Sequence, residues 1–365
     1  MIIMDVKLDN FYCFKNFHMN MSYPKKIVAT TIADEYLLDR PNFRYKKVNI
    51  LMGNNATGKT TLGKIIMLFT NYFKDESYAR FLSAICDKQK AAFMTIDFVS
   101  NLKLYRFHML IEPDPGVGNE NRNVEVNVSY VEIGMRDNYE TCAEKLNQQG
   151  KEVDIKKINA GGWSFSYPED AWKNTTYITL EKESKYLVIL EEILKTLDPS
   201  IKKIVEIDEI QNTYAIQFAD YSVIIKEGKI LDTEKLSSGT KAGLEISYII
   251  TSLICEMHEL YYCDELFSYV SSEVEKACLT IIIEKLKGDK QLFFTTHNTD
   301  LLDMQLPKHA FTFFKKDTQN DNLPIVCVNA ADYLKRNTDS LKHAVENDLF
   351  SIAPELSNLY GILEM

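Results

Sequence analysis

Short strand-like runs and longer helix-like runs alternate along much of this chain. Alternating or continuously apolar positions predict strands at 4–8, 17–22, 48–52, near Tyr261 and at 291–295, and a hairpin at 94–99 and 102–111. Residues 204–232 predict several strands with a turn at Glu227-Gly228. Apolar residues three and four positions apart predict helices at 60–73, 77–91, 184–196, 238–257 and 272–287. Because strand and helix alternate in the last third of the chain, we expect an α/β fold with a doubly wound sheet.

Two segments lack a sustained period. Residues 23–46 are charged and irregular, which predicts a loop or a small excursion. Residues 121–180 are polar, with short strand-like pieces and few helical patterns, and we interpret them as an insertion. The chain shows no internal repeat and no long heptad arm.

Composition narrows the classes of protein that fit. A length of 365 residues predicts one large α/β domain with a subdomain, or two lobes. No apolar run is long enough for a membrane span, and the N-terminus lacks the pattern of a secretory signal. The seven cysteines are odd in number and have no C-x-x-C spacing, which favours reduced thiols in the cytoplasm. A net charge of -10 argues against a broad nucleic-acid-binding face but leaves a local basic groove open.

The stretch GNNATGKT at 53–60 is the first candidate for chemistry. It matches the pattern G-x-x-x-x-G-K-[ST] between a predicted strand and a predicted helix. In this pattern backbone N–H groups and the helix N-terminus surround phosphate oxygens. Lys59 would reach the β- and γ-phosphates, and the Thr60 hydroxyl would bind Mg²⁺. The flanking strand and helix disfavour the alternative, which is an ordinary loop.

Two later strands end in polar clusters. In LYYCDE, Asp264 would hold Mg²⁺ and Glu265 would orient or deprotonate the attacking water. In QLFFTTHN, His297 would contact the γ-phosphate. Taken alone, each cluster also has an ordinary structural explanation.

The stretch LSSGTK opens the predicted helix at 238–257. Ser237, Ser238 and Gly239 are good residues for a helix start, and this capping role explains them adequately in isolation. The functional interpretation is a second anion site, formed by the Ser237 hydroxyl and the first N–H groups of the helix.

The order of these four stretches is that of the ABC ATPases. The sequence resembles the stand-alone ABC-type heads related to the SMC proteins, the double-strand-break repair ATPases and the OLD ATPases. Within that group it is similar to the small ATPase subunits of bacterial anti-phage defence systems, such as the AriA subunit of PARIS and the PtuA subunit of Septu. The resemblance lies in LDNFYCFKNFHMNMS, GNNATGKTTL, LSSGTKAG, CDEL and TTHNTDLLD. It covers both ends of the chain and does not place residues 113–177.

This resemblance implies a P-loop NTPase fold of the ABC-ATPase head type. The head would combine a mixed sheet with a helical signature subdomain and a polar β-rich insertion, in one domain over residues 1–365. Within it we expect a Walker A lobe at 1–112, an insertion and linker helix at 113–200, a signature region at 201–258, and a Walker B and His-loop lobe at 259–365.

The resemblance also implies ATP and Mg²⁺ as ligands. The residues expected to bind the nucleotide within one chain are Gly53, Asn54, Asn55, Ala56, Thr57, Gly58, Lys59, Thr60 and Thr61. Thr60 and Asp264 are the expected metal ligands. Glu265 is the expected general base, and His297 the γ-phosphate sensor.

Ser237 and Gly239 match the signature that caps the γ-phosphate of a partner subunit, and Ser238 between them is also expected to contact that nucleotide. Three positions depart from the family pattern. Ala56 replaces a loop glycine, which is tolerable if φ is not positive there, and Ser238 replaces the first signature glycine. After Glu265 the chain reads LFSYV in place of the leucine–aspartate turn of SMC-type heads, and no Q-loop glutamine can be placed.

The resemblance further implies a slowly hydrolysing ATPase that assembles through ATP held between two head-to-tail subunits. Such a homo-oligomer would act as a sensor and scaffold that controls a separate toxic effector, a nuclease, in response to a phage product, with no membrane involved. The alternative is a DNA-repair or recombination ATPase of the SMC-like type that acts directly on DNA. A small-molecule kinase would share the phosphate loop but would not explain LSSGTK or TTHN.

Overall fold

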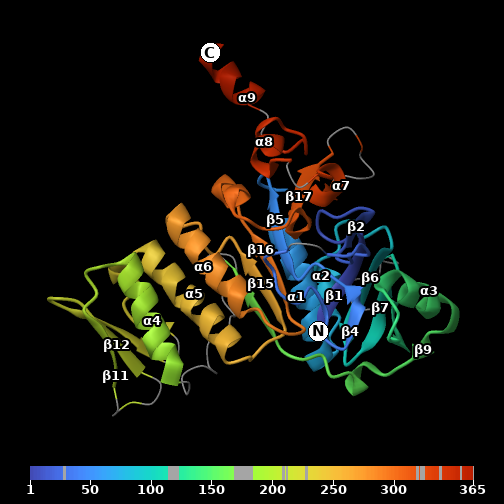
Figure 1. Cartoon of the computed structure of the whole chain (residues 1–365), viewed down its shortest axis with the longest axis horizontal. Coiled ribbons are helices and arrows are strands. Elements are labelled where there is room, and N and C mark those ends of the chain that lie inside the picture. Colours follow the sequence, from blue (N-terminus) through green and yellow to red (C-terminus); the bar gives the residue numbers. More distant parts are fainter. Residues whose placement is uncertain are drawn as a thin grey trace.

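In the part of the chain that the structure describes, three larger sheets, one two-stranded sheet (β3-β4) and the helices between them make up the fold (Figure 1). The computed structural model describes residues 1–27, 30–113, 123–167, 184–207, 210, 213–226, 229–317, 320, 325–336, 339–353 and 356–364. Parts of the predicted insertion, 114–122 and 168–183, therefore lie outside the described residues.

The central sheet has six strands in the order β10-β15-β16-β5-β17-β18. Its strands are β5 (Val48–Gly53), β10 (Trp163–Ser166), β15 (Leu260–Asp264), β16 (Gln291–Thr295), β17 (Phe311–Lys316) and β18 (Ile325–Asn329). All neighbours pair in parallel except β17 and β18, so the sheet is mixed. Both faces are covered, which explains why β15 and β16 are buried along their whole length.

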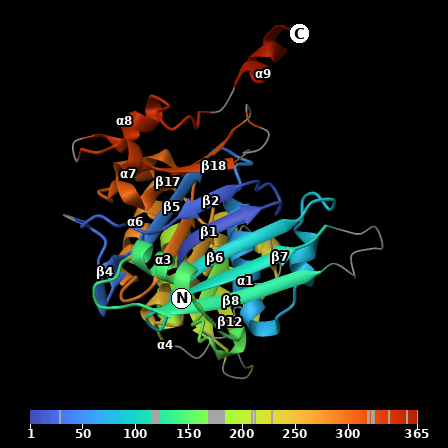
Figure 2. The same cartoon turned by 90° about the vertical axis from the view of Figure 1, so that its right-hand side faces the viewer.

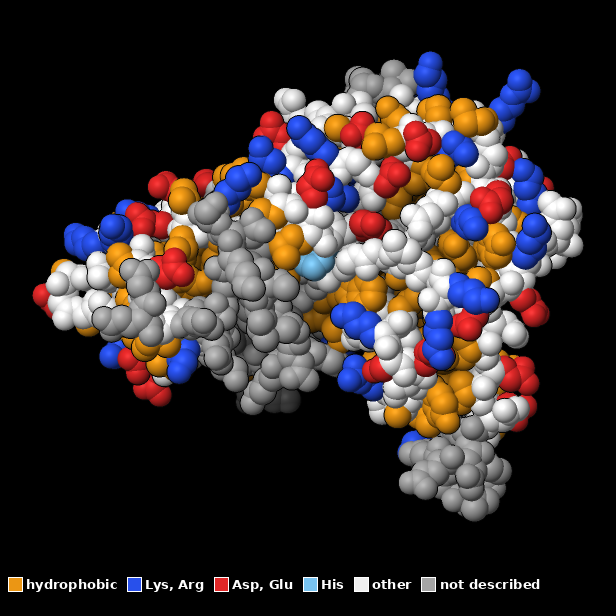
Figure 3. Space-filling view, turned by 90° about the horizontal axis from the view of Figure 1, so that it is seen from below, with side chains coloured by type: hydrophobic (Ala, Val, Ile, Leu, Met, Phe, Trp, Pro, Cys, Tyr) orange, Lys and Arg blue, Asp and Glu red, His pale blue; other side chains and the backbone are white. Residues whose placement is uncertain are grey.

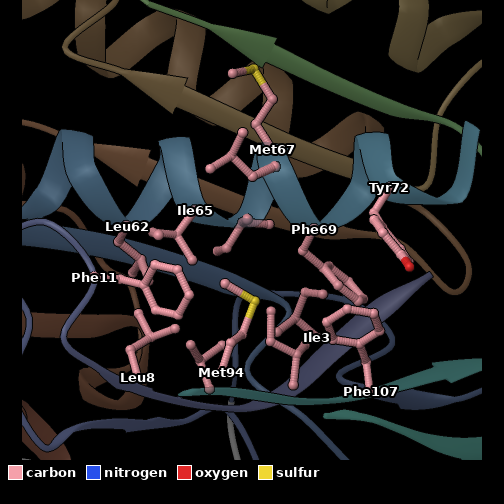
Figure 4. Close-up of a cluster of buried hydrophobic side chains, with 14 of the residues drawn as sticks. Ile3, Leu8, Phe11, Leu62, Ile65, Met67, Phe69, Tyr72, Met94 and Phe107 are labelled. Carbon is pink, nitrogen blue, oxygen red and sulfur yellow. The ribbon is translucent and has the colours of Figure 1, made fainter. Parts of the chain in front are cut away.

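The second sheet is antiparallel, in the order β2-β1-β6-β7-β8-β9 (Figure 2). Its strands are β1 (Ile2–Asp9), β2 (Phe17–Asn20), β6 (Ala92–Ser100), β7 (Lys103–Ile111), β8 (Val124–Glu132) and β9 (Lys151–Glu152). Helix α1 (Lys59–Asp75) lies between the two large sheets, and its Leu62, Ile65 and Phe69 share one apolar core with strands of both (Figure 4). Burial of this helix on both sides fixes its first turn relative to the sheet edge.

A smaller lobe is formed by α4 (Ser184–Leu197), α5 (Ser238–Ile254) and a four-stranded sheet (Figure 1). The sheet runs β11 (Lys203–Glu206), β12 (Thr213–Gln217), β13 (Ser222–Lys226) and β14 (Lys229–Ile230). Helix α4 packs on this sheet through Leu190 and Leu194, while α5 packs against α4 and against α6 (Ser272–Lys285). Helices α5 and α6 share an apolar core with strands of the central sheet, and this core attaches the smaller lobe to the sheet.

Shorter elements complete the described chain. They are β3 (Tyr36–Leu37), β4 (Arg40–Arg44), α2 (Ala79–Ser83), α3 (Tyr139–Gln149), η2 (Ile155–Lys157), η4 (Thr233–Lys235), η5 (Thr299–Asp303), η6 (Lys308–Ala310), α7 (Ala330–Tyr333), α8 (Leu341–Glu346), α9 (Ser357–Tyr360) and η7 (Gly361–Glu364). Among the described residues, none of the helices combines the length and apolarity that crossing a bilayer requires.

The helix predicted at 77–91 is wrong for most of its length, because α2 ends at Ser83. Beyond it, Ile85 forms a bridge with Phe11, and the Cys86 N–H donates to the Asn10 carbonyl. The Asn10 side-chain amide donates to the carbonyls of Asp87, Lys90 and Ala91. These long-range hydrogen bonds satisfy the backbone that a helix would otherwise have satisfied.

Helix α3 lies in the segment in which few helical patterns were expected. Its first N–H groups are capped by Asn138, whose side chain accepts from the Thr141 N–H at 2.9 Å, while the Thr141 hydroxyl accepts from the Asn138 N–H. Only Tyr139, Cys142 and Leu146 are buried along it, a narrow stripe that packs on the antiparallel sheet. The polarity of its remaining residues explains why the sequence pattern does not predict this helix.

Candidate nucleotide site

Three neighbouring parallel strands end at the same edge of the central sheet. Thr295 of β16 lies beside Asp264 of β15 on one side and beside Leu51 of β5 on the other. The polar residues that follow each strand are therefore brought together, although more than 200 positions separate Thr60 from Asp264. Ligands of open α/β sheets bind at such carboxyl edges.

The loop after β5 closes around the ammonium group of Lys59. Its Nζ donates to the carbonyl oxygens of Gly53 at 2.8 Å and Asn54 at 3.1 Å. The Thr57 hydroxyl donates to the same Asn54 carbonyl at 2.7 Å. Lys59 is 4% exposed, and burial lowers its pKa. The loop is thus folded around a cation whose partners are neutral carbonyl groups.

Two glycines give this loop its shape. Gly53 has a φ of 142°, and a Cβ there would overlap the carbonyl oxygen of Phe314. Gly58 has a φ of 90° and is the N-cap of α1, with no side-chain cap and no acidic residue in the first turn. The first N–H groups of α1 therefore have neither an intrahelical acceptor nor an acidic side chain in that turn, an arrangement that suits an anion.

Ala56 does not meet the condition set from the sequence, because its φ is 60°. A side chain in this left-handed region costs about 1–2 kcal/mol relative to glycine. Ala56 and Asn55 are exposed at the tip of the loop. The strain at Ala56 therefore comes from its positive φ and not from crowding by neighbouring side chains.

Thr60 and Asp264 form the second part of the site. The Thr60 hydroxyl donates to Asp264 Oδ2 at 2.7 Å, and the Thr295 hydroxyl donates to Oδ1 at 2.8 Å. Asp264 is 1% exposed, and burial raises its pKa while the two hydroxyl groups oppose the shift. A hydroxyl and a carboxylate oxygen in contact are hard oxygen ligands, and this donor set fits Mg²⁺.

Glu265 and His297 form the third part. Glu265 Oε1 lies 2.9 Å from His297 Nε2, and this contact lowers the pKa of the Glu265 carboxyl, which is therefore ionised at neutral pH. Glu265 has a φ of 46°, and its N–H donates to the Thr295 hydroxyl at 2.9 Å. Both side chains border a cavity of about 410 Å³ that also contacts Ser272, Glu275 and Asn298. A carboxylate and an imidazole thus face open space, which is lined by residues that end or follow β15 and β16 and by residues of α6, and by none of residues 53–61.

The signature residues are placed differently. Ser237 is the N-cap of α5, and its Oγ accepts from the Thr240 N–H at 3.0 Å and bonds to the Thr240 hydroxyl at 2.7 Å. Ser237 and Ser238 are exposed. Gly239 lies against the loop after Glu265, where a Cβ would be 3.0 Å from the Tyr269 carbonyl oxygen. The capping explanation from the sequence is therefore correct for Ser237, and its exposure leaves a second role open.

The sequence patterns do not identify several residues that bond to or pack against the residues of the site. Thr295 connects Asp264 to the backbone of Glu265, and the Tyr262 hydroxyl donates to the Lys59 carbonyl at 2.6 Å. A Cβ on Gly63 would overlap the Tyr262 ring, so this glycine allows α1 to approach β15. Thr61, predicted to bind nucleotide, bonds to the Cys13 thiol. The one available signal was the polar end of QLFFTTHN, which contains Thr295.

No protein-family model and no curated protein matches this chain. The solved structures that resemble this chain include SMC heads. The first, described as an SMC head bound to the C-winged helix domain of ScpA, has a TM-score of 0.52 and 14% identity, and the match covers 92% of this chain and 100% of that one. An SMC head with an extended coiled coil, bound to a ScpA domain derived from Pyrococcus furiosus, has a TM-score of 0.49, 13% identity and coverage of 92% and 98%. The SMC head of Thermotoga maritima has a TM-score of 0.45, 12% identity and coverage of 90% and 99%.

At 14% identity, the likeness to the SMC head with the TM-score of 0.52 shows the fold and no more. The chain has the P-loop ABC-type ATPase head fold, as the sequence predicts.

Proposed function

We propose that this chain is an ATP-binding and ATP-hydrolysing ABC-type head that assembles through nucleotide held between two copies. The observation that carries the proposal is the convergence of three parts at one sheet edge: the loop around Lys59, the Thr60–Asp264 pair and the Glu265–His297 pair. Each part has the chemistry that one portion of a triphosphate requires.

In this proposal the nucleotide is bound by the residues from Gly53 to Thr61. Lys59 exchanges its two carbonyl partners for β- and γ-phosphate oxygens, and the first N–H groups of α1 donate to the same phosphates. Thr60 and Asp264 would hold Mg²⁺, which neutralises charge on these oxygens when bound.

Glu265 then acts on the attacking water. Because its carboxyl is ionised, it accepts a proton as the water oxygen attacks the γ-phosphorus and the bond to the β–γ bridging oxygen breaks. His297 holds Glu265 and contacts the γ-phosphate. ADP and phosphate leave, and the ligand that joined two heads is lost.

The second half of the site comes from another copy. Ser237, Ser238 and Gly239 stand exposed or half-exposed at the tip of α5, where a second head would meet them with its γ-phosphate. ATP then favours the dimer by mass action, because it binds the pair more tightly than the separate heads. Head-to-tail dimers of this kind would build a homo-oligomer.

The Glu265→Gln variant tests this proposal. Loss of the base should lower turnover by about 100- to 1,000-fold and leave ATP-bound dimers that persist in sedimentation velocity with Mg²⁺ and ATP. Glu273→Gln, an exposed change on α6, is the matched control and should behave as the parent. The proposal is wrong if Glu265→Gln binds ATP and remains monomeric.

The biological role we propose is that of a cytoplasmic sensor and scaffold that restrains a toxic effector, a nuclease, until a phage product binds. Its support is the sequence resemblance to anti-phage ATPase subunits, so the role rests on analogy. The longest described helices, α1 and α5, have 17 residues each, and neither provides an arm for entrapping DNA. Expression of the native gene neighbourhood should protect cells from phage, and Lys59→Ala should abolish that protection; equal protection by both would refute the role.

The alternative function is a repair or recombination ATPase that acts directly on DNA. The net charge of -10 disfavours it, and on the face in Figure 3 Lys and Arg side chains are interspersed with Asp and Glu. This alternative predicts hydrolysis that DNA stimulates, with a steep dependence on salt. Turnover that is independent of added duplex DNA at low salt would remove it.

A further inference from the structure

We propose that Glu275 is a positioning residue for His297. Glu275 orients the histidine by binding the two residues that flank it. The inference rests on the proposed function for the role of His297, but its structural content can be tested without hydrolysis. Glu275 lies on α6, more than 20 positions before the segment that it holds, and it belongs to none of the four motifs in the sequence.

The Glu275 carboxylate bridges the residues on either side of His297. Its Oε1 accepts from the Thr296 hydroxyl at 2.8 Å, and its Oε2 accepts from the Asn298 side-chain amide at 2.7 Å. Both oxygens are therefore used, one on each side of the histidine. This two-point contact fixes the direction in which the backbone presents His297 to the cavity.

Further hydrogen bonds restrict the same segment. The Asn298 N–H donates to the Thr296 hydroxyl oxygen at 3.0 Å, and the Asn298 amide also donates to Ser272 Oγ at 3.0 Å. Ser272 in turn donates to Asp300 Oδ2 at 2.7 Å. Glu275 is the member of this network that contacts both neighbours of His297, so its removal should affect the histidine most.

Burial of the Glu275 carboxylate has a desolvation cost, which a purely structural contact does not require. Its side chain is 4% exposed, and burial raises its pKa, which the two hydrogen bonds oppose. The negative charge of Asp300 also raises the pKa of Glu275, and the smaller effect of the Lys276 charge lowers it. A carboxylate buried in this way is costly unless its hydrogen bonds are complete. What it supplies in return is a rigid, oriented segment beside the reacting groups.

The first test is a double-mutant cycle measured by ATP turnover. Glu275→Gln should lower kcat by about 10- to 100-fold, the range for residues that orient an active-site group, while ATP affinity changes less than about twofold. In a His297→Ala background the same change should have no further effect, because the residue it positions is absent. An additive loss in the double variant would overturn the inference, and Glu273→Gln is the matched surface control.

The second test uses nucleotide-free protein. NMR of the imidazole groups follows His297 directly, with its resonance assigned by its loss in His297→Ala. Glu275→Gln should shift or broaden that resonance, and Glu273→Gln should leave it unchanged. An unchanged His297 resonance in folded Glu275→Gln protein would overturn the inference.

A milder variant covers the case in which Glu275→Gln does not fold. Thr296→Val removes one of the two contacts to Glu275, together with the acceptor of the Asn298 N–H, and leaves the contact from Asn298 to Glu275. It should change kcat and the His297 resonance in the same direction, at smaller size. The arms also separate the two proposals. Absence of ATP binding in the parent protein would refute the proposed function, while the imidazole measurement would still decide the role of Glu275.

Discussion

The proposed site between two copies has two halves, the loop around Lys59 and the start of α5. They differ in how far one chain completes each of them. At the phosphate loop, Lys59 and Asp264 are 4% and 1% exposed, and their polar atoms bond to neighbours within the same chain. At the tip of α5, Ser237 and Ser238 are exposed, and the Ser237 hydroxyl bonds only within its own first turn in the contacts described above. One half is preorganised before nucleotide arrives, whereas the other presents an open surface.

This difference indicates which half contributes to the free energy of nucleotide binding and which to the free energy of assembly. Charged and polar groups that already lie at the loop need only a change of hydrogen-bond partner when phosphate binds, as proposed for Lys59, which favours tight binding and catalysis. An exposed helix start gains its value only when a second surface excludes water from it. Nucleotide affinity should therefore depend on the first half, and assembly on the second.

Lys59→Ala should have the largest effect. It removes a charge-assisted contact to phosphate and also the ammonium donor of the Gly53 carbonyl, so ATP affinity should fall at least about 100-fold. Calorimetric titration with Mg²⁺ and ATP measures this. Lys64→Ala, on the same helix but outside the loop, should bind ATP as the parent does. Equal affinity in both variants would contradict the assignment of the preorganised half.

Ser237→Asp should separate assembly from folding. Aspartate caps a helix as well as serine does, so thermal stability should stay within about 2 °C of the parent. The added negative charge would face the γ-phosphate of the partner and should weaken ATP-dependent dimerisation at least about tenfold in sedimentation velocity.

Two controls accompany this variant. Ser340→Asp makes the same change at the cap of α8 and should leave assembly intact. Ser237→Ala removes the cap and should cost about 1 kcal/mol of stability. Undisturbed ATP-dependent dimerisation by Ser237→Asp would show that α5 does not face a second nucleotide.

Ala56→Gly should have the smallest effect. At a φ of 60° glycine relieves about 1–2 kcal/mol of strain, but its greater freedom in the unfolded chain offsets up to about 1 kcal/mol. The net gain should be about 0.5 kcal/mol in urea unfolding of the nucleotide-free protein. Ala331→Gly, within α7, should instead destabilise by up to about 1 kcal/mol. A loss of 1 kcal/mol or more in Ala56→Gly would mean that the loop is not held in the left-handed conformation.

The local elements of the site could be predicted from the sequence. Continuous apolar runs identified β5 and β16 because both faces of a parallel sheet are buried. The glycines and the lysine of GNNATGKT identified the loop and the start of α1, since their chemistry is local to eight consecutive residues. The order of the four motifs led to the correct fold. The roles of the motif residues remain proposals that the variants above test.

Other features depend on contacts between distant segments, and only the tertiary structure decided them. The side chain of Asn10 determines that residues 85–91 do not continue α2. Sheet order places Asp264 beside Thr60, and packing of α6 places Glu275 beside Thr296 and Asn298. A sequence pattern reports which face of an element is buried, but the partner of that face is set by long-range pairing. For this reason the sequence identified the phosphate loop, while the network that holds His297 appeared only in the folded chain.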